Sequence, residues 1–198
     1  MRKFTIFVDM DSTLADMLQP LLDEYNYDYE DTLRVDDIVE FDIKKFAKPG
    51  VDIESYFKKD GFFEKLKPLP GAIEGLEALV RAGHEVIVAS SHSVNPNSAA
   101  EKLRWLKEHT PFIGHSDVML GVKKHKLRGD VFIDDAPHQA ARWLRENPDG
   151  VTMSIKWPYN NVSTHTAIFN DWRNPDMAWP LMIDYIALLT QRAEREVV

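Results

Sequence analysis

A chain of 198 residues with 44% hydrophobic and 11% aromatic side chains can bury a substantial core, and this composition is typical of globular proteins. The formal net charge of -8 argues against a broad nucleic-acid-binding face, because phosphate backbones are held by clustered Lys and Arg. Cysteine is absent, which excludes disulfides, thiolate metal sites and a cysteine nucleophile.

The first apolar run predicts a buried strand over residues 3–8, and two acids, Asp9 and Asp11, follow it at once. In open α/β sheets ligands bind at the carboxyl ends of strands, so we expect both acids to face a site. The run is too short for a secretion signal or a membrane span. We therefore predict a cytoplasmic protein with no membrane association.

Residues 17–67 are rich in acids, lysines and aromatic side chains and contain few long apolar runs. Pro68, Pro70 and Gly71 then mark a boundary before the next helical pattern. We interpret this segment as a small, mainly helical cap inserted after the first strand. The predicted domains are a core of residues 1–16 and 68–198 and a cap of residues 17–67.

Strand and helix patterns alternate through the rest of the chain. Strands are predicted over residues 85–89 and 131–133, and helices begin near Ile73, Ser98 and Pro137. Ser98 with Glu101 has the spacing of a capping box, and an apolar segment from Met177 to Leu189 is typical of a closing helix. This order predicts parallel βαβ units and a three-layer, Rossmann-like α/β core.

Each predicted strand ends in polar residues. Ser90 and Ser91 follow the second strand, and Asp134 and Asp135 follow the third. A single strand that ends in such residues is typical of a turn or a helix cap. Three such ends, together with a basic loop over residues 123–129, favour one shared site.

The polar strand ends resemble the four motifs of the haloacid dehalogenase (HAD) superfamily of phosphotransferases. DMDSTLAD resembles the first motif, ASS the second, Lys124 the third and IDD the fourth, and they occur in the same order. GFFEKLKPLPGA, EKLRWL, GDVFIDD and PYN are similar to stretches of the 5'(3')-deoxyribonucleotidase branch, and the resemblance covers most of residues 3–172. The chain differs from that branch in Ser12, where Gly is usual, and in Ser90, Ser91 and His92, where a Thr-Ser-Pro type motif is usual.

The resemblance implies roles for the acids. Asp9 would be the nucleophile, and Asp11 would protonate the leaving group and then activate water. Mg²⁺ is the expected cofactor, held by Asp9, by the carbonyl of Asp11 and by Asp135. Asp134 would support the site by orienting Lys124, although the choice between Asp134 and Asp135 as the metal ligand stays open.

Phosphate and substrate groups are expected to contact a second set of residues. Ser90, Ser91 and Lys124 would bind phosphate, with Lys123 in place of Lys124 if the alignment shifts by one residue. Met17, Phe41 and Tyr56 would line a pocket for the nucleobase, since an aromatic face can stack on a base. Aromatic residues in a cap also commonly pack it onto its core.

The predicted function is a magnesium-dependent phosphomonoesterase that dephosphorylates (deoxy)ribonucleoside monophosphates through an aspartyl phosphate. One alternative is a HAD phosphatase for another phosphomonoester, such as a sugar phosphate, phosphoserine or a polynucleotide 3' phosphate. The non-enzymatic alternatives are a phospho-switch and a catalytically silent binding protein. The expected partner is a small nucleotide, and a homodimer is left open.

Overall fold

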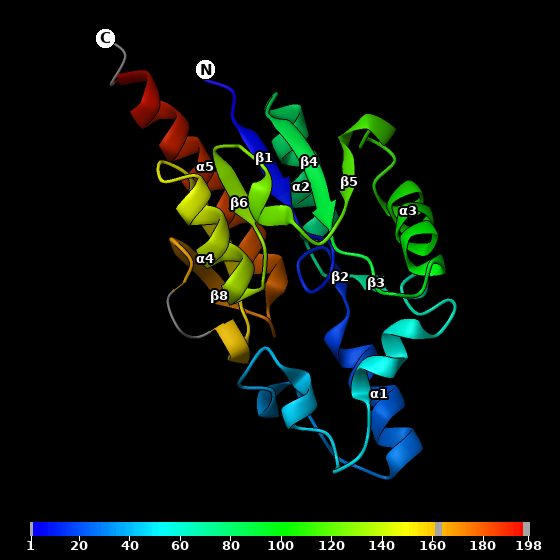
Figure 1. The fold of residues 1–198 in the computed structure, drawn as a ribbon. Coiled ribbons are helices and arrows are strands. Elements are labelled where there is room, and N and C mark those ends of the chain that lie inside the picture. Colours follow the sequence, from blue (N-terminus) through cyan, green and yellow to red (C-terminus); the bar gives the residue numbers. More distant parts are fainter. Residues whose placement is uncertain (1, 161–163, 196–198) are drawn as a thin grey trace.

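In the computed structural model, which describes residues 2–160 and 164–195, six parallel strands form the central sheet in the order β5-β4-β1-β6-β7-β8 (Figure 1). The strands are β1 (Thr5–Val8), β4 (Glu85–Ser90), β5 (Val118–Leu120), β6 (Val131–Ile133), β7 (Val151–Lys156) and β8 (Ala167–Asp171). The apolar strand β1 lies in the middle of the sheet, which suits a strand that is buried on both faces.

Helices cover both faces of this sheet. They are α2 (Ala72–Arg81), α3 (Asn97–His109), α4 (Pro137–Glu146) and α5 (Ala178–Arg195). Helices α2 and α5 pack against each other on one face, and Trp143 of α4 packs on Phe7 and Phe132 on the other. The predicted three-layer α/β architecture is confirmed. Within the described residues, none of these helices has the length and apolar character of a membrane span.

The strand register places the polar residues that follow β1, β4 and β6 side by side at the carboxyl ends of these strands. Val8 of β1 pairs with Val88 of β4 and with Ile133 of β6. The backbone N–H of Asp9 donates to the carbonyl of Ile133 at 2.8 Å. Because these three strands are parallel neighbours, the residues that follow them gather at the same edge of the sheet.

A helical insertion leaves the core after β1, as predicted. Its two ends pair as the short antiparallel strands β2 (Ala15–Asp16) and β3 (Lys67–Pro68). Between them lie helix α1 (Leu18–Tyr29) and three 3-10 turns over Val35–Asp37, Ile43–Lys45 and Ile53–Lys58. Figure 1 shows this insertion below the carboxyl ends of the strands.

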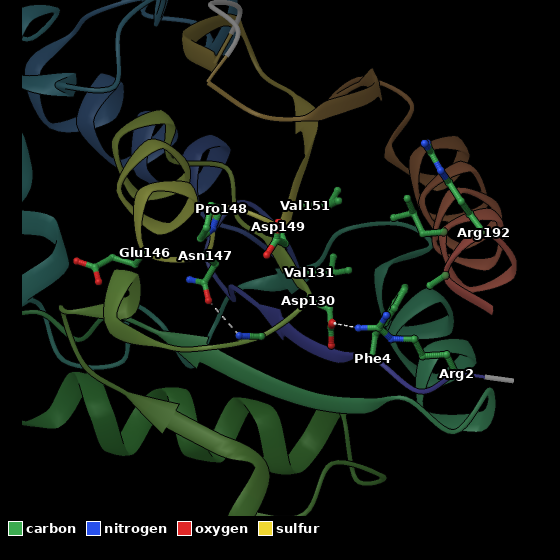
Figure 2. A pocket seen from close by; sticks show the side chains of 14 residues that line it. Arg2, Phe4, Asp130, Val131, Glu146, Asn147, Pro148, Asp149, Val151 and Arg192 are labelled. Atoms are coloured by element: carbon green, nitrogen blue, oxygen red, sulfur yellow. Dashed lines mark hydrogen bonds and ion pairs between the residues drawn. The ribbon is translucent and has the colours of Figure 1, made fainter. Parts of the chain in front are cut away.

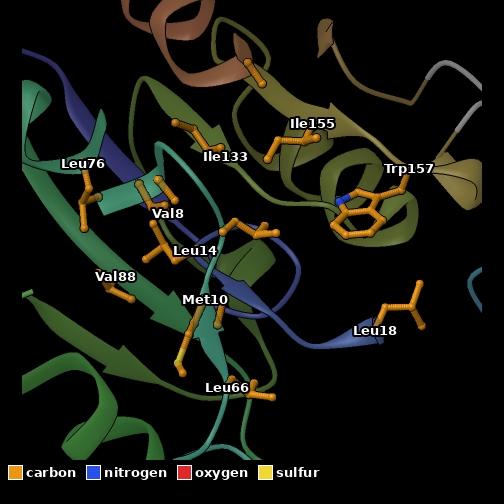
Figure 3. Packing of buried hydrophobic residues seen from close by; sticks show 14 of the residues in the cluster. Val8, Met10, Leu14, Leu18, Leu66, Leu76, Val88, Ile133, Ile155 and Trp157 are labelled. Atoms are coloured by element: carbon orange, nitrogen blue, oxygen red, sulfur yellow. The ribbon is translucent and has the colours of Figure 1, made fainter. Parts of the chain in front are cut away.

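The hydrophobic core runs without a break from the sheet into the insertion. Val8 at the end of β1 belongs to the same buried cluster as Met10, Leu14 and Leu18, which continue toward α1 (Figure 3). Leu66 enters this cluster from the returning end of the insertion. Close packing of this kind resists displacement of the loop that carries Asp9 and Asp11.

Two local features differ from the sequence-based expectations. Strands β5, β7 and β8 were not predicted, because β5 and β8 are not fully buried and β7 buries the polar residues Thr152 and Ser154. The capping box at Ser98 and Glu101 is wrong. The Ser98 hydroxyl donates to the carbonyl of Asn95 at 2.7 Å, and the Glu101 carboxylate accepts hydrogen bonds from the insertion instead.

Gly75 allows α2 and α5 to approach closely, since a Cβ at this position would lie 2.5 Å from Cε3 of Trp179. We expect Gly75→Ala to lower the free energy of unfolding by roughly 1 to 2 kcal/mol, because overpacking outweighs the gain of about 1 kcal/mol in helix propensity. Gly121→Ala is the control, since no atom lies within 4 Å of its added Cβ. Urea denaturation measures both, and equal stability of the two variants would contradict this packing.

Candidate active site

A cavity of about 760 Å³ lies away from the predicted site, between the end of α4 and helix α5 (Figure 2). Arg2 in this cavity donates to Asp130 at 3.2 Å, and the Asn147 side-chain oxygen accepts from the backbone N–H of Gly129 at 3.3 Å. These polar groups are already paired within the protein. None of the sequence-predicted site residues lines this cavity.

A second cavity, of about 280 Å³, lies at the carboxyl ends of the strands. Its acidic, lysine and hydroxyl-bearing lining consists of Asp9, Asp11, Ser91, Ser93, Lys102, Lys124 and Asp135. Apolar and aromatic side chains face the same space from the insertion and from α4, namely Met17, Phe41, Phe57, Phe63 and His138. A polar floor beside an aromatic wall is typical of a pocket for an amphipathic ligand.

Lys124 joins two of the acids. Its Nζ lies 2.7 Å from Asp9 Oδ2 and 2.5 Å from Asp134 Oδ2, and all three side chains are buried. Burial acts to lower the pKa of Lys124, but the two carboxylates outweigh it and raise the pKa above its usual value. Lys124 is therefore a permanent positive charge beside Asp9.

Asp134 and Asp135 have different surroundings although they are adjacent. Both oxygens of Asp134 accept hydrogen bonds, from Lys124 at 2.5 Å and from the backbone N–H of Ala136 at 2.9 Å. Asp135 lines the cavity and accepts a hydrogen bond at Oδ2 from the Tyr159 hydroxyl at 2.6 Å. No group within residues 2–160 and 164–195 is hydrogen-bonded to Asp135 Oδ1, so this oxygen is available to a ligand.

The three buried acids Asp9, Asp134 and Asp135 fit a divalent cation. One carboxylate oxygen of each lies within 4.8 Å of those of the others. Burial, followed by the charges of Asp134 and Asp9, raises the pKa of Asp135 well above its usual value. Burial also raises the pKa of Asp134 to about 7, against the opposing effect of Lys124. A cation with hard oxygen ligands would offset this excess of negative charge.

Asp11 is bound by a lysine that sequence reasoning missed. Lys102 of α3 is 0% exposed, and its Nζ donates to Asp11 Oδ2, to Ser90 Oγ at 3.0 Å and to the carbonyl of Ser91 at 2.6 Å. Burial raises the pKa of Asp11 against the opposing charge of Lys102. Lys102 thus links the loop after β1 to the loop after β4.

A signal for Lys102 was present in the sequence. The buried residues of α3 recur at helical spacing, at Ser98, Glu101, Lys102, Trp105 and Leu106. Lys102 was given no role from the sequence, because a lysine is rarely fully buried. A lysine on the inner face of a helix beside a predicted acidic site is the pattern that could have identified it.

The two predicted phosphate-binding serines lie in different environments. Ser91 lines the cavity, whereas Ser90 is fully buried and its hydroxyl accepts from Lys102. Ser12 adopts φ +54, a conformation that favours glycine, and its carbonyl accepts a hydrogen bond from Trp157 Nε1 at 2.9 Å. This explains why a glycine at position 12 would suit the same turn.

The structure corrects one predicted pocket residue. Met17 and Phe41 line the cavity, but Tyr56 does not. Its ring is buried inside the insertion and its hydroxyl donates to Asp28 Oδ2 at 2.6 Å. The adjacent Phe57 faces the cavity instead, because the 3-10 turn over Ile53–Lys58 directs neighbouring side chains to different sides.

Comparison with known proteins identifies the family of the chain. The profile of the family described as "5' nucleotidase, deoxy (Pyrimidine), cytosolic type C protein" matches residues 2–181. The chain belongs to this family. It is 31% identical over 170 residues to a 5'(3')-deoxyribonucleotidase from Bacillus subtilis, a match that covers 86% of this chain and 95% of that protein. A 5'(3')-deoxyribonucleotidase from Clostridium acetobutylicum is 32% identical over 139 residues, covering 69% and 76%.

Solved structures resemble the fold at lower sequence identity. A HAD family hydrolase from Deinococcus radiodurans, with bound phosphate and sodium, has a TM-score of 0.56 at 12% identity and covers 86% of this chain and 92% of its own. A haloacid dehalogenase-like hydrolase from Burkholderia xenovorans has a TM-score of 0.54 at 16% identity, covering 89% and 96%. The predicted HAD-like fold and the nucleotidase branch are both confirmed, and the protein is a phosphoric monoester hydrolase.

The acid cluster predicts that a divalent cation stabilises the folded protein. A cation at one hundred times its dissociation constant should add about 2.7 kcal/mol, which raises the melting temperature by roughly 5 to 10 °C. Because Asp134 and Asp135 have raised pKa values, they hold protons at low pH and release them as pH rises. The stabilisation should therefore be larger near pH 8 than near pH 5.5.

Thermal denaturation with and without the cation measures this effect. The Asp135→Asn variant keeps the shape of the side chain and its contact with Tyr159 but loses a charge. We expect it to lose most of the cation-dependent shift, while Asp149→Asn, on the exposed surface, keeps it. An equal shift in both variants would place the cation elsewhere.

Proposed function

We propose that this protein is a Mg²⁺-dependent phosphatase of deoxyribonucleoside monophosphates that acts through an aspartyl phosphate on Asp9. One observation carries the proposal. Asp9 lies in the cavity at the carboxyl ends of the strands beside the ammonium of Lys124, while Asp11, Ser91 and Asp135 face the same cavity. The names of the relatives from Bacillus subtilis and Clostridium acetobutylicum support the choice of nucleotide.

Asp9 would begin the reaction as the nucleophile. One of its carboxylate oxygens attacks phosphorus in line, and the bond between phosphorus and the ester oxygen breaks. Asp11 donates a proton to the departing oxygen, so that the nucleoside leaves as a neutral alcohol. Lys124 stays charged beside Asp9 and offsets the negative charge that reaches the site with the phosphate.

In the second step Asp11 would act as a general base. Its carboxylate accepts a proton from water, and the oxygen of that water attacks phosphorus of the aspartyl phosphate. The bond between phosphorus and Asp9 breaks, which releases inorganic phosphate and restores the carboxylate. Two displacements at phosphorus replace one more difficult displacement.

The acid cluster would hold Mg²⁺ through Asp9, the Asp11 carbonyl and Asp135. The bound cation would neutralise charge on the phosphate oxygens and orient them. Asp134 is the less suitable ligand, because its side chain is fully buried and does not line the cavity, whereas Asp135 does. Its role would be to hold Lys124 toward Asp9. Ser91, which lines the cavity, is the better phosphate donor of the two serines.

The insertion of residues 17–67 would serve as the cap that recognises the nucleoside. Phe41 is 46% exposed, and its ring lies 4.8 Å from that of His138 and 5.6 Å from that of Tyr159 between centroids. Phe57 and Phe63 face the cavity from the other end of the insertion. Such an apolar wall suits a planar base better than a sugar phosphate or phosphoserine, which offer no aromatic face.

A panel of phosphomonoesters tests the activity. We expect Mg²⁺-dependent phosphate release from deoxynucleoside monophosphates, with a lower kcat/KM for a sugar phosphate and for phosphoserine. Asp9→Asn should lower kcat by roughly 10³-fold or more, because it removes the nucleophile. Asp149→Asn is the control for the loss of a carboxylate and should retain activity. A preference for phosphoserine or a sugar phosphate would contradict the proposed substrate.

Trapping the intermediate tests the mechanism separately. After acid quench with substrate labelled in the phosphate, the protein should carry a label that hydroxylamine removes, as expected of an acyl phosphate. Asp9→Asn should carry none. A label that persists in Asp9→Asn would move the nucleophile to another residue.

Phe41→Leu tests the aromatic wall. Because stacking of a base on an aromatic ring contributes about 1 to 3 kcal/mol, KM for the nucleotide should rise roughly 5-fold to 150-fold with a smaller change in kcat. KM for an ester without an aromatic group, such as glycerol phosphate, should change little. Steady-state kinetics measure both, and an equal rise in the two KM values would argue against base stacking.

A further inference from the structure

Two adjacent residues of α3, Glu101 and Lys102, are both buried and point to different parts of the molecule. The Glu101 carboxylate accepts hydrogen bonds from the backbone N–H groups of Gly61 at 2.6 Å and of Phe63 at 3.1 Å. Gly61 and Phe63 both lie in the part of the insertion that returns to the core. Hydrogen bonds from backbone amides to a buried carboxylate are among the stronger ones in proteins.

Lys102 has its three donors occupied by protein oxygens. Its Nζ contacts Asp11 Oδ2, Ser90 Oγ at 3.0 Å and the Ser91 carbonyl at 2.6 Å. An ammonium has no more than three hydrogens to donate. Lys102 therefore fixes one oxygen of Asp11 and with it the plane of that carboxylate.

Phe63 connects the two residues. Its backbone N–H is held by Glu101, and its ring lies 4.4 Å from Lys102 Nζ, measured to the ring centroid. The same ring lines the cavity beside Asp11. A ring in this position shields the contact between Lys102 and Asp11 from water, which strengthens an ion pair of this kind.

The rest of the returning segment is anchored to the same helix. Arg104 contacts Glu64 through two hydrogen bonds of 2.8 and 2.9 Å, and Trp105 Nε1 donates to the Leu66 carbonyl at 2.7 Å. Helix α3 thus forms hydrogen bonds both to the insertion and to the loop after β1. A shift of residues 61–66 would move the Phe63 ring and so change its contact with Lys102.

We propose that Lys102 is a positioning residue for Asp11, and that the pair Glu101 and Lys102 couples the seating of the insertion to the orientation of that acid. When residues 61–63 are seated on Glu101, the Phe63 ring covers Lys102 and Asp11 is held in one orientation. When they are displaced, the ring leaves and water competes for the ammonium. This inference rests on the proposed reaction, in which Asp11 donates the proton to the leaving group.

The test uses two esters that differ in their need for that proton. A deoxynucleoside is a poor leaving group and depends on general acid catalysis, whereas p-nitrophenolate is stable as an anion and depends on it little. The ratio kcat/KM reports the steps up to departure of the leaving group. A variant that misplaces Asp11 should therefore lower kcat/KM for the nucleotide far more than for p-nitrophenyl phosphate.

Lys102→Met removes the ammonium and keeps the length of the side chain. We expect kcat/KM for the nucleotide to fall by roughly 10² or more, and kcat/KM for p-nitrophenyl phosphate by less than about 10-fold. A burst of nitrophenolate should precede the steady state, because activation of water still depends on Asp11. Lys107→Met, on the exposed face of the same helix, is the control and should leave both ratios unchanged.

Glu101→Gln tests the coupling without touching Lys102 or the cavity and remains informative if Lys102→Met does not fold. It should produce the same selective loss at a smaller size, of about 10-fold for the nucleotide, because the amides of Gly61 and Phe63 lose a charged acceptor. Equal losses for the two esters in either variant would overturn the inference and leave the proposed function standing. Failure of the native protein to hydrolyse either ester would overturn the proposed function as well.

Discussion

The contact of Lys124 with Asp9 and Asp134 is the interaction on which the site depends. Two ionised carboxylates buried near each other repel, and Lys124 offsets this repulsion with contacts of 2.7 and 2.5 Å to Asp9 and Asp134. A third buried acid, Asp135, has the Tyr159 hydroxyl as the one hydrogen-bond partner of its carboxylate among the residues that the structure describes. The buried acids at this edge of the sheet repel one another. This repulsion would be relieved by a cation, which could bind together with an anionic ester.

The rest of the molecule keeps these charges in place. Parallel pairing of β1 with β4 and β6 sets the residues after the three strands at one level. The buried cluster through Met10 and Leu14 fixes the loop after β1, and α3 supports both that loop and the insertion through Lys102 and Glu101. In the proposed reaction, binding and chemistry would therefore use side chains from separate elements whose relative positions are set by packing.

The sequence was most informative where local pattern and site coincide. The apolar run before Asp9 predicted both the central strand and the acids at its end, because a short buried strand has a clear pattern. Lys102 was missed because its role depends on contacts with Asp11 and Ser90, which are distant along the chain. Tyr56 was misplaced because the direction of a side chain in a 3-10 turn depends on tertiary packing, which the type of residue does not encode.

The central claim is that Asp9 receives the phosphoryl group at a site completed by a cation. A crystal structure with Mg²⁺ and beryllofluoride, which mimics an acyl phosphate, tests it most directly. The account predicts beryllium bonded to a carboxylate oxygen of Asp9, with Mg²⁺ held by Asp135 and with Lys124 beside Asp9. Beryllofluoride on another residue, or Mg²⁺ bound away from Asp9 and Asp135, would contradict it.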